Sequence, residues 1–159
     1  MILHIKGSNK AFRKLVESAT WFYAEKLMGK RLMAGLEITI KLKKNLLSKD
    51  GYEGTAIWED DGYRPKEFTI ELDTSVKIRN LLITLAHEMV HVKQWAKNEM
   101  YEYLNTMGMV RFKGEKIHLK ETEYWDYPWE IEAYGKQLGL FVRFCEHMGF
   151  ERDDMKEEA

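Results

Sequence analysis

The sequence has a single cysteine and no long apolar run. Cys145 has no second cysteine to pair with, so an internal disulfide is excluded, and so is a zinc ribbon built from paired CxxC motifs. No run of about 18 apolar residues exists that could span a membrane. The amino terminus also lacks the apolar stretch of a signal peptide. We therefore expect a cytoplasmic protein without a membrane partner.

An excess of charge of one sign is also missing. The 25 Lys and Arg residues nearly balance the 26 Asp and Glu residues, which leaves a net charge of −1. This balance gives no reason to expect nucleic acid as a partner. Hydrophobic residues make up 45% of the 159 positions, which suits one globular domain with a single core. We expect that domain to span residues 1–150 and an acidic tail to span residues 151–159.

Hydrophobic periodicity predicts an α+β domain in which a helix precedes three strands and further helices follow. The first helix is expected over residues 8–28, with Ser8 as its cap and Gly29 at its end. A long helix is expected over residues 75–98, and a C-terminal helix is expected to begin near Pro128.

The strands of this domain are expected to form a small sheet. Strict alternation predicts a half-buried strand over residues 36–43, and two more are expected over 54–59 and 66–72. The last two are separated by four turn-forming residues, Asp60, Asp61, Gly62 and Pro65. After the long helix we expect a short helical piece near 100–107, then an irregular segment or short strand over 110–127.

The segment His87-Glu88-Met89-Val90-His91 lies within the predicted long helix. Its two histidines stand four residues apart, so both side chains project from one face and can bind one Zn²⁺. Glu88 lies at the edge of that face, where it can take a proton from a water molecule that zinc has polarised and later pass it to a leaving amine. The pattern predicts zinc as cofactor and Glu88 as general base.

The helix around this motif is apolar on nearly all sides, and only Arg79, Lys93 and Lys97 are expected to face solvent. One narrow polar stripe interrupts the apolar surface: Asn80, Thr84, His87, His91, Gln94 and Asn98. Polar groups on a buried helix need partners, which a metal and its surrounding hydrogen bonds would supply. The alternative is a pair of surface histidines on an amphipathic helix.

A catalytic zinc usually has three protein ligands and a water molecule, so one further ligand is expected downstream. The candidates are His118, Glu121, Glu123, Glu130, Glu132 and His147. Glu130 lies on the inward face of the C-terminal helix, and we favour it as the ligand, with capping of that helix as its alternative role. Glu132 lies on the opposite, solvated side and is expected to pair with Lys136. His118 is the second choice of ligand.

These residues resemble zincin-type metallopeptidases, specifically the gluzincin arrangement in which HExxH is followed by a glutamate on a later helix. Glu130-Ile131-Glu132-Ala133 matches the ExxA pattern of several such families, and Tyr134 stands where membrane-bound relatives have aspartate. The segments HEMVHVKQ, FKGE and YWDYPWEIEAYG also resemble small SprT-like metallopeptidase domains, of the kind that bacteriophages often encode. For a viral protein the cytoplasm would be that of the host.

The resemblance covers roughly residues 84–138 and implies a zincin-like fold, in which a twisted sheet of three or more strands covers the active-site helix. It also implies an edge strand that pairs with an extended peptide substrate. An oxyanion stabiliser is expected as well. The tyrosines that could serve are Tyr52, Tyr124, Tyr127 and Tyr134, of which we favour Tyr134 because it lies one turn beyond Glu130.

The sequence thus predicts a zinc metallopeptidase acting on a peptide or protein, with His87, His91 and Glu130 as zinc ligands and Glu88 and Tyr134 as catalytic residues. The alternative is a zincin-like binding module without catalysis that engages a macromolecular partner, with residues 110–127 as its contact surface. A hydrolase of nonpeptide substrates would use the same water chemistry.

Overall fold

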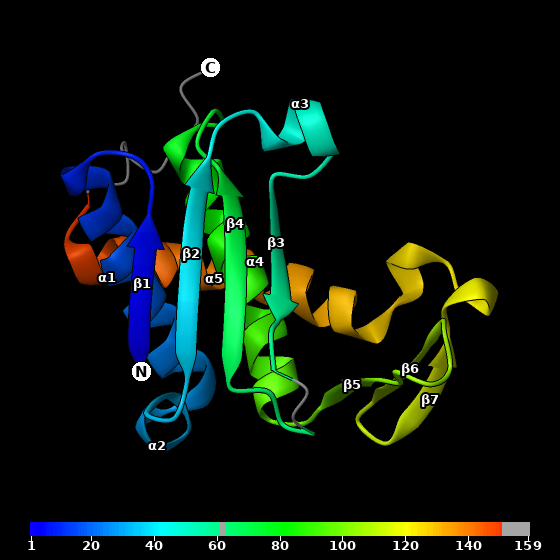
Figure 1. The fold of residues 1–159 in the computed structure, drawn as a ribbon. Coiled ribbons are helices and arrows are strands. Elements are labelled where there is room, and N and C mark those ends of the chain that lie inside the picture. Colours follow the sequence, from blue (N-terminus) through cyan, green and yellow to red (C-terminus); the bar gives the residue numbers. More distant parts are fainter. Residues whose placement is uncertain (61–62, 151–159) are drawn as a thin grey trace.

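The computed structural model describes residues 1–60 and 63–150, which form one α+β domain (Figure 1). The helices in these ranges are α1 (Lys10–Met28), α2 (Lys30–Met33), α3 (Leu46–Asp50), α4 (Ile78–Ala96) and α5 (Pro128–Met148). The strands are β1 (Ile2–Lys6), β2 (Glu37–Lys43), β3 (Gly54–Trp58), β4 (Glu67–Asp73), β5 (Met100–Glu102), β6 (Met109–Phe112) and β7 (Glu115–His118). Asp61, Gly62 and the predicted acidic tail lie outside the described residues. Within them, no helix is long and apolar enough to cross a bilayer.

The main sheet has the strand order β1-β2-β4-β3. Strands β1, β2 and β4 are parallel, whereas β3 runs antiparallel to β4 and forms an edge. Helices α1, α4 and α5 pack behind one face of this sheet (Figure 1). The predicted alternation in β2 is confirmed, because Ile38, Ile40 and Leu42 are buried against these helices. One face of the sheet thus packs against α4 and fixes its position.

Helix α4 lies at the centre of the domain. It packs against α1, α5, β3 and β4, and its residues from Leu85 to Ala96 are all buried. The sequence-based prediction of a buried helix is therefore confirmed. The helix ends before Asn98, which adopts a left-handed conformation (φ 57°) that asparagine tolerates better than most residues.

Three sequence predictions of local structure were wrong. Asn9, not Ser8, caps α1, because its side chain accepts a hydrogen bond from the Phe12 amide at 2.9 Å. Strand β1 was not expected; its five residues gain their order by pairing with β2. The piece near 100–107 is not helical, because β5 pairs with β6 in a second, antiparallel sheet that β7 completes.

Lys93 and Glu132 also differ from expectation. Lys93 does not face solvent; its buried ammonium lies 2.6 Å from the Glu99 carboxylate and 2.5 Å from that of Glu132. Glu132 does not pair with Lys136, since its second oxygen accepts a hydrogen bond from Lys113 at 2.9 Å. Although burial opposes it, the two lysines hold the pKa of Glu132 below its ordinary value. This charge network joins α4, α5 and the β6–β7 turn.

Replacement of Lys93 by methionine is expected to destabilise the fold, because Glu99 loses its cation and Glu132 loses one of two. Breaking a buried ion pair typically costs about 3 kcal/mol. We expect urea denaturation to show a loss of that size in the free energy of unfolding. Lys136→Met, at the exposed position first expected to pair with Glu132, should change it by less than about 0.5 kcal/mol. Equal losses in the two variants would contradict the network.

Candidate metal centre

Two histidines of α4 and one glutamate of α5 meet at the interface of these helices. The Nε2 atoms of His87 and His91 are 3.1 Å apart. The two carboxylate oxygens of Glu130 lie 3.2 Å from His87 Nε2 and 3.5 Å from His91 Nε2. Both histidines are buried, and the Glu130 side chain is only 13% exposed. The structure therefore brings together all three predicted zinc ligands.

Each histidine is oriented by a glutamine. His87 Nδ1 lies 2.8 Å from Gln137 Oε1, and His91 Nδ1 lies 2.8 Å from Gln94 Oε1. The Gln94 amide nitrogen donates to the Trp129 carbonyl at 3.0 Å, so its oxygen has to face His91. An Nδ1–H group that donates to an amide oxygen leaves the lone pair on Nε2. Both Nε2 lone pairs therefore point at the space that the Glu130 carboxylate also faces.

The spacing of these atoms fits a zinc ion. Zinc binds nitrogen and oxygen at about 2.0–2.2 Å, and tetrahedral angles then separate the ligand atoms by about 3.3 Å. The three distances in the cluster, 3.1, 3.2 and 3.5 Å, lie around that value. Without a cation between them, two facing lone pairs and a carboxylate repel one another unless a proton is shared. The donor set and its geometry thus match a site for a divalent metal.

The other candidate ligands lie apart from this cluster. His118 ends β7 and is exposed, Glu121 and Glu123 are exposed, and the ring of His147 packs against Phe22. Glu132 belongs to the lysine network. Glu130 does not cap helix α5, since its carboxylate contacts His87, His91 and the Tyr124 hydroxyl. Among the described residues, His87, His91 and Glu130 are the group suited to a metal.

Glu88 lies beside His87 and is almost completely buried. Burial raises the pKa of its carboxyl; the charges of His91 and His87 and the backbone amide of Ala56 on β3 oppose this only in part. A raised pKa makes the carboxylate a stronger base. Glu88 also lines the cavities on both sides of the cluster, so it can reach a molecule bound there.

The cluster lies in a cleft between β3 and the two helices. A cavity of about 570 Å³ lies on one side, and one of about 270 Å³ lies on the other. Gly54, His87, Glu88 and Tyr124 line both cavities, so the two are continuous at the cluster. The larger one extends toward Tyr52, Glu53 and Asn80, and the smaller one toward Trp95, Met100 and Glu102.

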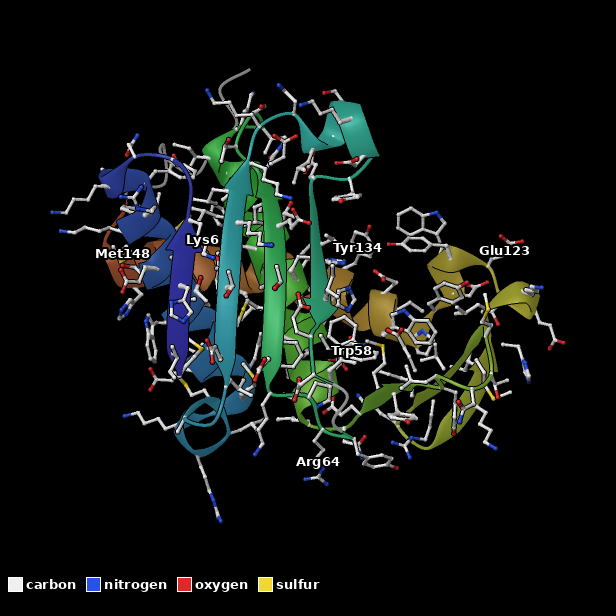
Figure 2. The ribbon with its side chains drawn as sticks, in the orientation of Figure 1. Lys6, Trp58, Arg64, Glu123, Tyr134 and Met148 are labelled. Atoms are coloured by element: carbon white, nitrogen blue, oxygen red, sulfur yellow. The ribbon has the colours of Figure 1, made fainter. Side chains whose placement is uncertain are left out.

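Two of the four candidate tyrosines lie beside the cluster. The Tyr134 ring packs edge-on against His87 with 4.6 Å between ring centroids, and its hydroxyl lies 3.5 Å from that of Tyr124. Figure 2 shows Tyr134 on the open side of β3. The Tyr124 hydroxyl donates to Glu130 at 3.1 Å. Tyr127 points elsewhere, because its hydroxyl donates to the Leu119 carbonyl, and Tyr52 lines the larger cavity.

Comparison of the chain with protein-family models, with curated proteins and with solved structures gave no significant match in any of the three. The assignment of the site therefore depends on its own chemistry.

Removal of the Glu130 carboxylate should abolish tight zinc binding, because two histidines alone leave the set of protein ligands incomplete. We expect Glu130→Ala to lose its zinc on dialysis, whereas the wild type keeps about one zinc per chain. His118→Ala is the matched control and should keep its zinc. Elemental analysis of the purified proteins measures this. If Glu130→Ala kept its zinc and His118→Ala lost it, the third ligand would be His118 and not Glu130.

Proposed function

We propose that this chain is a zinc-dependent metallopeptidase of the zincin type, resembling small SprT-like domains. The main support is that the imidazole lone pairs of His87 and His91 and the carboxylate of Glu130 converge in a cleft beside Glu88. A purely structural zinc site has no need of a buried, unligated carboxylate next to its metal. We also propose the cytoplasm as its setting.

In the proposed reaction His87, His91 and Glu130 hold zinc, which would polarise a water molecule and lower its pKa toward 7. Glu88 would accept a proton from the attacking water molecule as its oxygen bonds to the peptide carbonyl carbon. The same carboxyl group would then give the proton to the leaving amine when the C–N bond breaks. The burial of Glu88 suits the first step, because a raised pKa makes its carboxylate a stronger base.

Strand β3 is the element that we expect to bind the substrate backbone. The Asp73 amide donates to the Glu53 carbonyl and the Glu59 amide donates to the Glu67 carbonyl, which fixes the alternation of the ladder. Consequently the backbone groups of Gly54, Ala56 and Trp58 point away from β4, toward the cleft. The Ala56 amide already contacts Glu88, so an extended peptide could pair with the other backbone groups of this edge and be recognised through its backbone.

Tyr134 remains our choice as oxyanion stabiliser. Its hydroxyl lies at the rim of the cleft, and its ring is held against His87. The neighbouring Tyr124 hydroxyl already donates to Glu130, so it is less free to donate to a developing oxyanion.

A noncatalytic binding module is the second candidate function. It is favoured by the exposure of Trp125, which is 69% accessible beside Tyr134 and would suit a contact surface. Such a module would need neither Glu88 nor a vacant position on the metal.

Glu88→Gln separates the two functions. The change keeps the shape of the side chain but removes the base, so we expect about one zinc per chain and a loss of peptide cleavage of at least about a hundredfold. A screen with mixed fluorogenic peptides measures this, with the exposed Glu123→Gln as control that keeps wild-type activity. If Glu88→Gln cleaved peptides at the wild-type rate, the mechanism would be wrong. If the wild type cleaved none, the binding module would be favoured.

A further inference from the structure

The smaller cavity contains a carboxylate that the proposed reaction does not use. Glu102 is the last residue of β5, and the alternation of the strand places it on the same side as the buried Met100. Tyr101, between them, faces the other side and packs against the Arg111 guanidinium. Glu102 therefore faces the cavity that begins at the metal centre.

Glu102 differs from the other carboxylates near α4 because it has no cation. Glu99 and Glu132 are paired with Lys93, whereas no Lys or Arg in the described part of the chain forms an ion pair with Glu102. Glu102 is exposed as a residue, but its carboxyl group is partly covered, which raises the pKa of that group; the neighbouring Trp58 and Trp95 indoles and the charge of His91 offset only part of this. A carboxylate in such surroundings attracts a positive group.

The charge of the whole cleft favours the same kind of group. Four carboxylates line the two cavities, and no lysine or arginine within the described ranges does so: the acidic residues are Glu53, Glu88, Glu102 and Glu130. A zinc ion would offset two of these charges. The remaining negative charge attracts cationic substrates and repels acidic ones.

A second feature of the same cavity points to a peptide ligand. Trp95 is only 7% exposed and lines the smaller cavity, and its Nε1–H has no hydrogen-bond partner among the described residues. The indole lies close enough to Glu102 to lower the pKa of that carboxyl, but its N–H has no acceptor that satisfies hydrogen-bond geometry. An unsatisfied buried donor costs about 1–3 kcal/mol, which a carbonyl group of a bound peptide would recover.

The walls of the cavity suit a long aliphatic stem with a charged end. Trp95, Met100 and Trp129 contribute apolar walls to the cavity that Glu102 and the metal centre also line. A small hollow lined by Trp58 shares Trp95, Met100 and Glu102 with this cavity. In Figure 2, Trp58 lies on the open side of β3. Arginine and lysine both place a methylene stem along such walls, and their cationic ends gain further from nearby indole rings.

We infer that Glu102, Trp95 and Met100 form a subsite for the side chain of a lysine or arginine in a peptide substrate. The inference rests on the proposed function, since it assigns a substrate class to that same cleft. In the bound state the cationic end contacts Glu102, and a backbone carbonyl of the peptide accepts the Trp95 Nε1–H.

Peptide binding to zinc-loaded Glu88→Gln tests the subsite without cleavage. The probes are labelled extended peptides of alanine and glycine in which one arginine is moved along the sequence. A matched series carries citrulline, which has nearly the same shape but no charge. We expect fluorescence anisotropy to show, at one position, at least about tenfold tighter binding of arginine, which corresponds to about 1.4 kcal/mol.

Adding Glu102→Gln should remove this preference, and Glu102→Ala serves as a second variant if the first folds poorly. Glu53→Gln is the matched control, because it removes one charge from the other end of the same cleft and should leave the preference intact. Equal binding of arginine and citrulline at every position would overturn the subsite. So would a preference that survives both Glu102 variants, or one that Glu53→Gln abolishes equally.

The two proposals can fail separately. A wild-type protein that cleaves peptides but shows no arginine preference would retain the proposed function and lose the subsite. A protein that binds arginine peptides through Glu102 but cleaves none would lose the peptidase and keep the subsite.

Discussion

Two imidazole nitrogens and a carboxylate, from His87, His91 and Glu130, meet at one buried point, where their electron pairs repel one another. The arrangement of the whole site depends on how the fold holds these groups together. The imidazoles of His87 and His91 would turn away from each other and from Glu130 if nothing held them. Gln94 and Gln137 do hold them, by accepting hydrogen bonds from the far nitrogen of each ring. The fold thus maintains an arrangement that is unfavourable without a cation and favourable with one.

The packing of α4 against α5 keeps these groups in register. Two acidic residues of α5, Glu130 and Glu132, contact different groups of α4. Glu130 faces the histidines, and Glu132 faces Lys93, which lies only two residues beyond His91 on α4. Because Lys113 of the β6–β7 turn also binds Glu132, the small sheet is tied to the same interface. Two of the elements that bound the cleft, α4 and α5, are therefore joined to the small sheet by one charge network.

Much of this arrangement could be predicted from the sequence, because it depends on helical periodicity. The burial of α4 follows from its apolar surface, and Glu130 was favoured over Glu132 by the face of α5 on which it lies. The polar stripe also indicated that Gln94 needed a partner. In the structure that partner is His91.

The features that could not be predicted from the sequence depend on contacts between distant segments. Strands β1, β5, β6 and β7 have three to five residues each, which is too short for a clear pattern, and they are ordered by their neighbours. Lys93 was expected in solvent because its position on the helix does not reveal that Glu99 and Glu132 lie opposite it. Gln137 as the support of His87, and Glu102 as a wall of the cleft, likewise depend on tertiary packing.

X-ray absorption at the zinc edge of the loaded protein tests the proposed metal centre directly, because it detects the ligand atoms themselves. A zinc site formed by His87, His91 and Glu130 predicts two imidazole nitrogens and carboxylate or water oxygens at about 2.0–2.2 Å, with no sulfur. The signal of one imidazole should disappear in His91→Ala. A sulfur ligand at about 2.3 Å, or an imidazole count that His91→Ala leaves unchanged, would contradict it.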